Sequence, residues 1–172
     1  MIKFISNNNL LVDTLNSYYL EHSFVLVNNH YFQKIKLEND EKNIILEFEK
    51  KKILIPLPIQ ISVLKNEINK VLSNFEIQLR NFNYYPFQNF IQTESKKVFL
   101  TNIQNLIFSN LINAKQGLDK NVLYETIWKQ DKDISINKLD THLTNLKNLL
   151  NSSLNIHITF QSKNKKIELL ID

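Results

Sequence analysis

The sequence is poor in the residues that build nucleotide-binding loops and thiol chemistry. It has one Gly, three Pro and no Cys among 172 residues. Dinucleotide-binding fingerprints and Walker A loops need several closely spaced glycines, because the backbone must approach phosphate without a side chain in the way. Without cysteine there is no disulfide scaffold, thiolate zinc site, iron–sulfur cluster or cysteine nucleophile. These classes of protein are excluded.

Long apolar runs are also missing. The opening segment, MIKFISNNNLL, has too short an apolar run for a secretory signal. No stretch approaches the ~20 apolar residues that a membrane span needs. A hydrophobic content of 43% with 22% charged residues is ordinary for a chain that buries a core. We therefore expect a cytoplasmic protein of one or two small domains with no membrane partner.

Positive charge is concentrated in the C-terminal part of the chain. The formal net charge is +4, and Arg80 is the only arginine. Residues 1–95 hold ten basic and ten acidic residues, whereas residues 96–172 hold eleven lysines and seven acids. One interpretation is a polyanionic partner for the C-terminal part. The other is scatter, because the excess is small.

The first 73 residues alternate between strand and helix patterns. The order begins as β-α-β, and a composition change near Asn74 marks a domain boundary, so we expect domains at 1–73 and 74–172. The Lys50–Lys52 segment is interpreted as a hairpin tip rather than a binding patch. The periodicities predict strands over residues 1–6, 24–27, 31–37, 44–48 and 53–55, and helices over residues 9–21 and 59–73.

The C-terminal part predicts a short antiparallel sheet followed by three helices and a hairpin. Residues 74–100 alternate as short strands. Thr101 is placed to cap a first helix that ends at Gly117, where a glycine fits a left-handed C-cap, and Asp119 is placed to cap a second helix. A third helix from about residue 136 to residue 150 carries a leucine stripe, and a hairpin over residues 155–171 turns at residues 161–165. The stripe consists of Leu139, Leu143, Leu146 and Leu150.

Three short helices followed by a β-hairpin make a winged helix, which is a variant of the helix-turn-helix. With its leucines buried, the third helix presents polar side chains on the opposite face. Short polar donors and lysines suit phosphates and base edges in a major groove, and Asn145 could make a bidentate contact to adenine. The residues expected on or beside this face are Lys138, Thr141, His142, Thr144, Asn145, Lys147 and Asn148.

The hairpin turn places Lys163, Lys165 and Lys166 where a wing would lie along the DNA backbone or minor groove. Binding through such lysines weakens steeply with salt, because each phosphate contact releases counterions. A plain solvated turn is the other interpretation of these lysines. His142 could similarly be a core histidine, although its neighbours on that face are polar. Trp128 is interpreted as a packing residue rather than a stacking platform for a ligand.

From Phe99 to the C-terminus, the residues resemble the OmpR/PhoB-type winged-helix family of response regulators. The resemblance implies that His142, Thr144 and Lys147 contact phosphates, that Asn145 faces bases and that Thr159 in the wing touches the backbone. It also implies contact of the 129–135 loop with RNA polymerase. The sequence departs from the family in lacking an Arg-rich recognition helix and a glycine-rich wing. The residues that carry the resemblance are Leu100-Thr101, Gly117, Leu123 and Trp128, Leu139-Asp140-Thr141-His142-Leu143, and Leu146-Lys147.

In that family a receiver domain precedes the winged helix. Residues 1–73 resemble its first and last pieces, but the segment is too short and Ser6-Asn7-Asn8-Asn9 stands where an acidic cluster would hold Mg²⁺. We expect a degenerate, shortened receiver-like α/β domain with no phosphoacceptor, which forms a homodimer through the 59–73 helix or contacts another protein. The expected fold class is thus α+β, with this domain ahead of the winged helix.

Catalysis has little support, since no Ser/His/Asp arrangement has a supporting turn. His22, His30 and His157 share no metal-ligand spacing, so neither a metal nor a cofactor is expected. The leading hypothesis is a sequence-specific duplex-DNA-binding transcription regulator that is not an enzyme, acts as a homodimer and needs no phosphorylation. The alternative is a non-catalytic protein-interaction module that keeps the winged-helix fold and has lost DNA binding.

Overall fold

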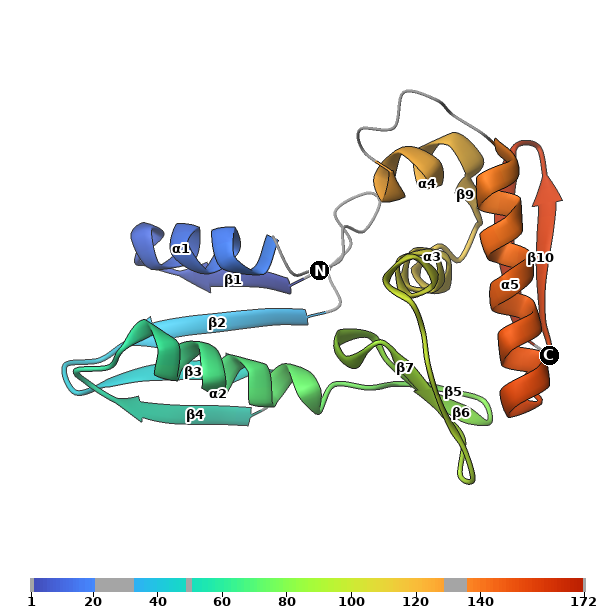
Figure 1. Cartoon of the computed structure of the whole chain (residues 1–172). Helices are drawn as coiled ribbons and strands as arrows, with labels where there is room; N and C mark the ends of the chain where they lie inside the picture. Colours follow the sequence, from blue (N-terminus) through green and yellow to red (C-terminus); the bar gives the residue numbers. More distant parts are fainter. Residues whose placement is uncertain (1, 21–32, 49–50, 129–135, 172) are drawn as a thin grey trace. The chain divides into compact units, whose positions relative to one another are not determined.

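The chain folds into two compact units that both mix helices and strands (Figure 1). The computed structural model describes residues 2–20, 33–48, 51–128 and 136–171. Of these, the residues up to Asn74 form unit 1 and those from Phe75 onward form unit 2. The α+β class predicted from the sequence is confirmed.

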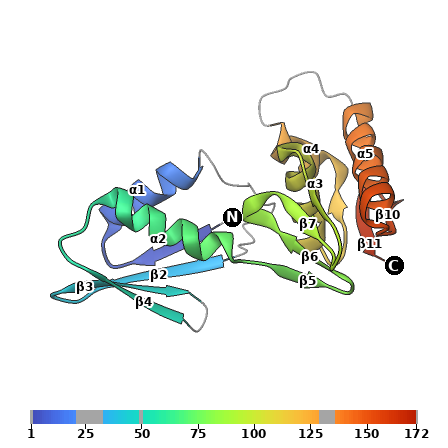
Figure 2. The same ribbon diagram turned by 60° about the horizontal axis from the view of Figure 1, so that its bottom comes forward.

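Unit 1 is a four-stranded sheet covered on one face by two helices (Figure 2). The strands lie in the order β1-β2-β3-β4; β1 and β2 are parallel, and the other neighbours are antiparallel. The Tyr19 hydroxyl on the first helix donates to Asn69 Oδ1 on the second helix at 2.8 Å. The elements are β1 (Ile2–Ser6), α1 (Asn9–Leu20), β2 (Gln33–Asn39), β3 (Asn43–Phe48), β4 (Lys51–Pro56) and α2 (Ile61–Ser73).

The mixed sheet does not show the receiver-like fold, because receivers have a doubly wound parallel sheet. Parallel neighbours need a crossover connection of about a dozen residues or more, whereas β2 and β3 are joined by a short turn that imposes antiparallel pairing. In that turn the Asp40 carboxylate accepts hydrogen bonds from the backbone N–H groups of Lys42 at 2.8 Å and Asn43 at 2.6 Å. These bonds also hold the pKa of Asp40 below its ordinary value.

The parallel partner of β1 in unit 1 is β2. The strand expected over residues 24–27 lies outside the described residues. Lys51 and Lys52 are the first two residues of β4, and they pair with Phe48 and Glu47 at the end of the β3–β4 hairpin. The two lysines therefore lie beside the tip of the hairpin, within its paired part.

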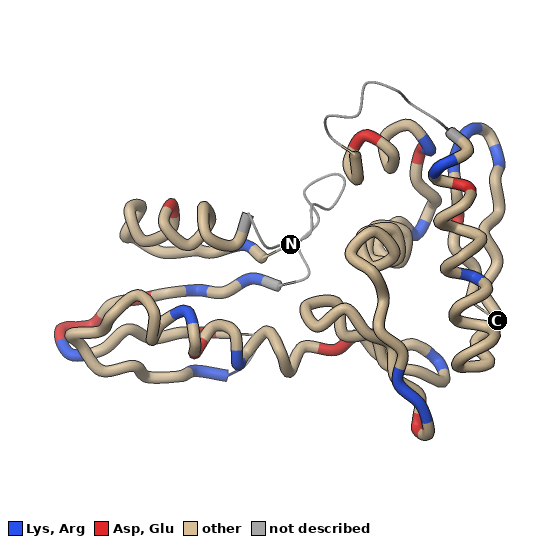
Figure 3. Tube along the Cα trace, in the orientation of Figure 1, with Lys and Arg blue, Asp and Glu red and all other residues tan. Residues whose placement is uncertain are grey.

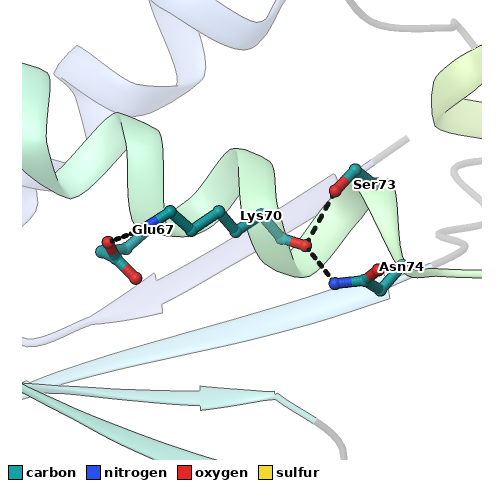
Figure 4. A network of polar contacts seen from close by, with 4 residues as sticks. All are labelled: Glu67, Lys70, Ser73 and Asn74. Carbon is teal, nitrogen blue, oxygen red and sulfur yellow. Dashed lines mark hydrogen bonds and ion pairs between the residues drawn. The ribbon is translucent and has the colours of Figure 1, made fainter.

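Polar contacts stabilise the last turn of α2, at the end of unit 1 (Figure 4). The Lys70 carbonyl accepts hydrogen bonds from the Ser73 hydroxyl at 2.9 Å and from the Asn74 side-chain amide at 2.8 Å. The Lys70 ammonium pairs with Glu67 one turn earlier. Carbonyls at a helix end have no intrahelical partner, so the Ser73 and Asn74 side chains satisfy one of them.

Unit 2 begins with a four-stranded antiparallel sheet, as predicted, and continues with three helices and a hairpin. The sheet consists of β5 (Ile77–Leu79), β6 (Phe82–Tyr85), β7 (Phe90–Gln92) and β8 (Lys97–Phe99), with a 3-10 turn at Pro86–Gln88. The rest consists of α3 (Asn102–Asn113), β9 (Leu118–Asp119), α4 (Lys120–Ile127), α5 (Ile136–Leu154), β10 (Ile158–Lys163) and β11 (Lys166–Ile171).

The sheet is joined to α3 by a buried polar cluster centred on Asn105. The Tyr84 hydroxyl donates to Asn105 Oδ1 at 2.6 Å, and the burial of Tyr84 raises its pKa. Asn105 Nδ2 in turn donates to the Pro86 carbonyl at 3.0 Å and to Asn89 Oδ1 at 2.6 Å. Because every polar atom of the Asn105 side chain is paired, its burial carries no uncompensated desolvation cost.

Replacing Asn105 with leucine should lower the free energy of unfolding of the chain by about 2–4 kcal/mol, since it leaves the buried Tyr84 hydroxyl without this acceptor. Urea unfolding monitored by circular dichroism measures the decrease. Asn121→Ala on the exposed surface of α4 is the matched control and should stay within about 0.5 kcal/mol of the parent chain. Equal destabilisation in the two variants would contradict the structural role of the cluster.

Candidate nucleic-acid interface

The second half of unit 2 has the winged-helix arrangement that the sequence predicts. Helices α3, α4 and α5 pack beside a three-stranded sheet in the order β10-β11-β9, with β10 and β11 forming the wing hairpin (Figure 1). The short β9 strand pairs with β11 through Leu118 and Ile167, and both side chains are buried. The hairpin is therefore held to the helices at its base and along β11.

Gly117 makes the close approach of β9 to β11 possible. Its φ of +71° is left-handed, and a Cβ atom there would lie 3.1 Å from the Ile167 carbonyl oxygen. The expectation of a left-handed glycine is confirmed, but α3 ends at Asn113 and Gly117 lies in the turn that follows. The absence of a side chain at Gly117 therefore allows both the left-handed turn and the pairing of β9 with β11.

Helix α5 buries the predicted leucine stripe and is longer than expected. Leu139, Leu143, Leu146 and Leu150 are all buried, and Leu154 continues the stripe one turn further. The helix therefore runs to Leu154 in place of the predicted end at residue 150. Burial of this stripe turns the polar side of the helix outward.

The exposed side of α5 is almost uniformly neutral and polar. The Thr141 hydroxyl donates to the Asn137 carbonyl at 2.8 Å, and the Thr144 hydroxyl donates to the Asp140 carbonyl at 2.9 Å. The side chains of Asn145 and Asn148 have no hydrogen-bond partner among the residues that the structure describes. The exposed residues are Asn137, Asp140, Thr141, Thr144, Asn145, Lys147, Asn148, Asn151 and Ser152.

Lys138 and His142 lie at the edge of this face, where they are half-buried against Trp128. The His142 ring lies 5.6 Å from the Trp128 ring, and the Lys138 ammonium lies 4.9 Å from its centroid. Trp128 also packs on Tyr124 at 4.6 Å between ring centroids. The tryptophan thus packs α4 against α5 and restricts how far the Lys138 and His142 side chains can move.

The wing turn is tighter than the sequence predicts. Strands β10 and β11 run until Lys163 pairs with Lys166, which leaves Asn164 and Lys165 as the turn. Both turn residues have positive φ, as the two-residue turns that match the twist of hairpins require. Lys163, Lys165 and Lys166 are all exposed at this tip. Thr159 lies in β10 opposite Leu170 and is half-buried.

Lys120, at the start of α4, links the wing tip to α5. Its backbone N–H donates to the Lys165 carbonyl at 2.9 Å, and its ammonium forms an ion pair with Asp140 Oδ1 at 3.0 Å. Through Lys120 the wing tip and the first turns of α5 therefore belong to one continuous surface, and Figure 3 shows the two segments side by side. The sequence prediction did not pair Lys120 with Asp140, because the two positions lie 20 residues apart.

The charged residues at the wing tip are all lysines, whereas α5 carries both lysine and aspartate (Figure 3). Asp140 is neutralised by Lys120, and the Asp119 carboxylate caps α4 by accepting from the backbone N–H groups of Asn121 and Val122. Lys147 is the one cation among the exposed α5 residues described above. Positive charge toward a partner therefore comes mainly from the wing.

Neither a metal site nor a membrane-spanning helix occurs in the described part of the chain. No group of three or more His, Asp or Glu side chains could hold a metal ion there. No helix in that part is long and apolar enough to cross a membrane. The 129–135 loop, for which the resemblance implies contact with RNA polymerase, lies outside the described residues.

No protein-family model and no curated protein sequence matches the chain. Among solved structures, the DNA-binding domain of E. coli CadC is similar with a TM-score of 0.46 and 11% identity, over 55% of this chain and 91% of that one. The C-terminal domain of the nisin resistance regulator NsrR, a lantibiotic response regulator, is similar with a TM-score of 0.42 and 22% identity, over 56% and 96% of the two chains.

A third similar structure belongs to a family of redox sensors in the streptococci that evolved from two-component response regulators. Its TM-score is 0.43 and its identity 16%, over 67% of this chain. The present chain covers 55% of the length of that protein.

Proposed function

We propose that this protein is a duplex-DNA-binding transcription regulator of the response-regulator type. The observation that carries the proposal is the continuous surface formed by the exposed polar face of α5 and the lysine-bearing tip of the wing. The Lys120 bridge supports it, because this contact holds the wing beside the first turns of α5. A helix with a polar face fits the major groove, and lysines beside it can reach adjacent phosphates.

Each predicted site residue has a role in this proposal. Lys147 meets phosphates from the exposed face of α5, and Asn145 faces the bases. Thr144 also faces the bases, because its hydroxyl proton is already donated to the Asp140 carbonyl. Lys138 and His142 contact the backbone from the edge of the face, where Trp128 holds them. The remaining residues extend the contact along the groove and the wing; they are Thr141, Asn148, Thr159, Lys163, Lys165 and Lys166.

DNA binding by this protein is proposed to need no phosphorylation. The end of β1 and the loop that follows it offer Ser6, Asn7 and Asn8, whose neutral side chains are poor ligands for the Mg²⁺ that phosphoryl transfer requires. The described residues also hold no cluster of acids that could bind a metal elsewhere. Regulation would then act through the amount of protein or through a partner of unit 1.

Unit 1 is proposed to form the homodimer. Dimerisation doubles the phosphate contacts and lets the protein read two half-sites. Among the described residues, most of the exposed large hydrophobic side chains belong to this unit, including two in the first turn of α2. They are Ile5, Leu10, Leu54, Leu57, Ile61 and Val63. Such side chains are available to be covered by a second copy of the chain.

A second candidate function is a protein-interaction module that keeps the winged helix without binding DNA. The observation that favours it is the low net charge of the exposed face of α5, where Lys147 and the ion-paired Asp140 are the charged residues. Measurement of DNA affinity separates the two functions, because the module would bind no duplex even at low salt.

Fluorescence anisotropy with the full chain and a mixture of duplex fragments, in the absence of any phosphodonor, tests the leading proposal. Replacing Lys163, Lys165 and Lys166 together by alanine should weaken binding about tenfold or more. It should also reduce the slope of log affinity against log salt by about 0.9 for each phosphate that the variant no longer neutralises. No salt-sensitive binding by the parent chain would overturn the proposal.

A triple variant of unit 1, with Lys34, Lys51 and Lys52 replaced by alanine, is the matched control. These three lysines are exposed, and their removal lowers the net charge by the same amount. The affinity of the control for DNA should stay within about twofold of that of the parent chain, because salt screens the long-range attraction between net charge and DNA. Equal weakening in both triple variants would contradict a specific role for the wing.

Dimerisation is tested by sedimentation velocity of the full chain. The parent chain should sediment as a dimer, whereas Ile61→Lys with Val63→Lys should sediment as a folded monomer, since charges at these exposed positions oppose burial. Val122→Lys on α4 of unit 2 is the control and should remain dimeric. A parent chain that stays monomeric even on DNA would contradict the dimer.

A further inference from the structure

Most of the exposed side chains of α5 are amides and hydroxyls, and the amides and the threonine methyl groups are of the kinds that contact A·T base pairs. The single arginine of the chain, Arg80, lies in the turn between β5 and β6 and is part of neither α5 nor the wing. Arginine or lysine contacts to the O6 and N7 atoms of guanine are the commonest way to select G·C pairs. Lys147 is the one such donor on the exposed face, which leaves little means to select guanine.

Two of the four asparagines of the face, Asn145 and Asn148, lie near its middle and carry free hydrogen-bonding groups. Asn145 and Asn148 are exposed, and neither carboxamide is paired with another described residue. A carboxamide donates and accepts at once, which matches the N7 acceptor and the N6 donor that adenine presents in the major groove. Both side chains are thus available for bidentate contacts to adenine.

The two threonines of the face have already used their hydroxyl protons. Thr141 donates to the Asn137 carbonyl and Thr144 donates to the Asp140 carbonyl within the helix. A hydroxyl has one proton, so neither threonine has a donor left for the guanine or adenine acceptors. Each still offers its methyl group, which is the kind of side-chain group that contacts the C5-methyl of thymine.

We infer that α5 reads A·T base pairs directly in the major groove, with Asn145 on adenine and Thr144 against thymine. This inference rests on the proposed function and names the class of DNA sequence that the site selects. The wing lysines supply affinity without sequence information, since phosphate contacts position a protein and base contacts specify. Sequence selectivity is therefore carried by α5, whereas the wing contributes affinity alone.

Selection of duplexes from a random pool by the full chain tests the inference. The selected sites should be rich in A·T pairs at positions facing α5. Replacing these A·T pairs by inosine·cytosine pairs then distinguishes recognition in the major groove from recognition in the minor groove. An inosine·cytosine pair lacks the minor-groove amino group, as A·T does, but presents the major-groove O6 and N7 acceptors of G·C. Affinity should fall roughly fivefold or more for each replaced pair that faces α5.

Variants assign the readout to particular side chains. Asn145→Ala should lose the discrimination between A·T and inosine·cytosine at the pair that Asn145 faces, whereas Asn66→Ala on the exposed surface of α2 should discriminate as the parent chain does. Thr144→Val keeps the methyl group and should keep the preference for thymine over uracil, which Thr144→Ser should lose.

The possible outcomes distinguish this inference from the proposed function. Selection of G·C-rich sites, or full affinity for the inosine·cytosine form, would overturn the major-groove reading of A·T and leave DNA binding intact. A chain that binds no duplex at any salt concentration would overturn both. The base substitutions are measured with the parent chain, so they decide the question even where a variant fails to fold.

Discussion

Burial of the leucine stripe of α5 is the constraint on which the rest of the proposed surface depends. Leu139, Leu143, Leu146 and Leu150 are each at most 6% exposed. Together they bury enough apolar area to hold the helix firmly on the core. Because helical geometry sets the opposite face once one face is buried, the outward position of Thr144 and Asn145 follows from these leucines. The outward direction of Thr144 and Asn145 is therefore set by the helix and needs no contact with another element.

The wing is held to the same frame by backbone contacts. Pairing of β11 with β9 requires the left-handed, side-chain-free Gly117, and the Lys165 carbonyl accepts from the Lys120 N–H at the start of α4. Charged side chains at the tip therefore project from a fixed backbone, which reduces the entropic cost when they engage a partner. The chain's single glycine thus stands at a turn where a side chain would obstruct the sheet.

Sequence patterns predicted most of unit 2 because its signals are local. The helix caps at Thr101 and Asp119, the leucine spacing and the alternation of the wing strands all act within a few residues. The Lys120–Asp140 pair and the Asn105 cluster were not predicted, because they join residues that only the tertiary fold brings together. The receiver-like fold expected for unit 1 is not shown by its mixed sheet. Sequence periodicity indicates a strand but does not give the direction of the neighbouring strand, so it could not predict this pairing.

The central claim is that α5 and the wing together form the DNA-binding surface. Backbone amide chemical shifts of the full chain, followed by NMR during titration with a selected duplex, test it most directly. We predict that the largest changes fall on residues 141–148 and 163–166, while the outward face of the unit 1 sheet, including Lys34 and Lys36, changes little. Large changes confined to unit 1, or none on α5, would contradict it.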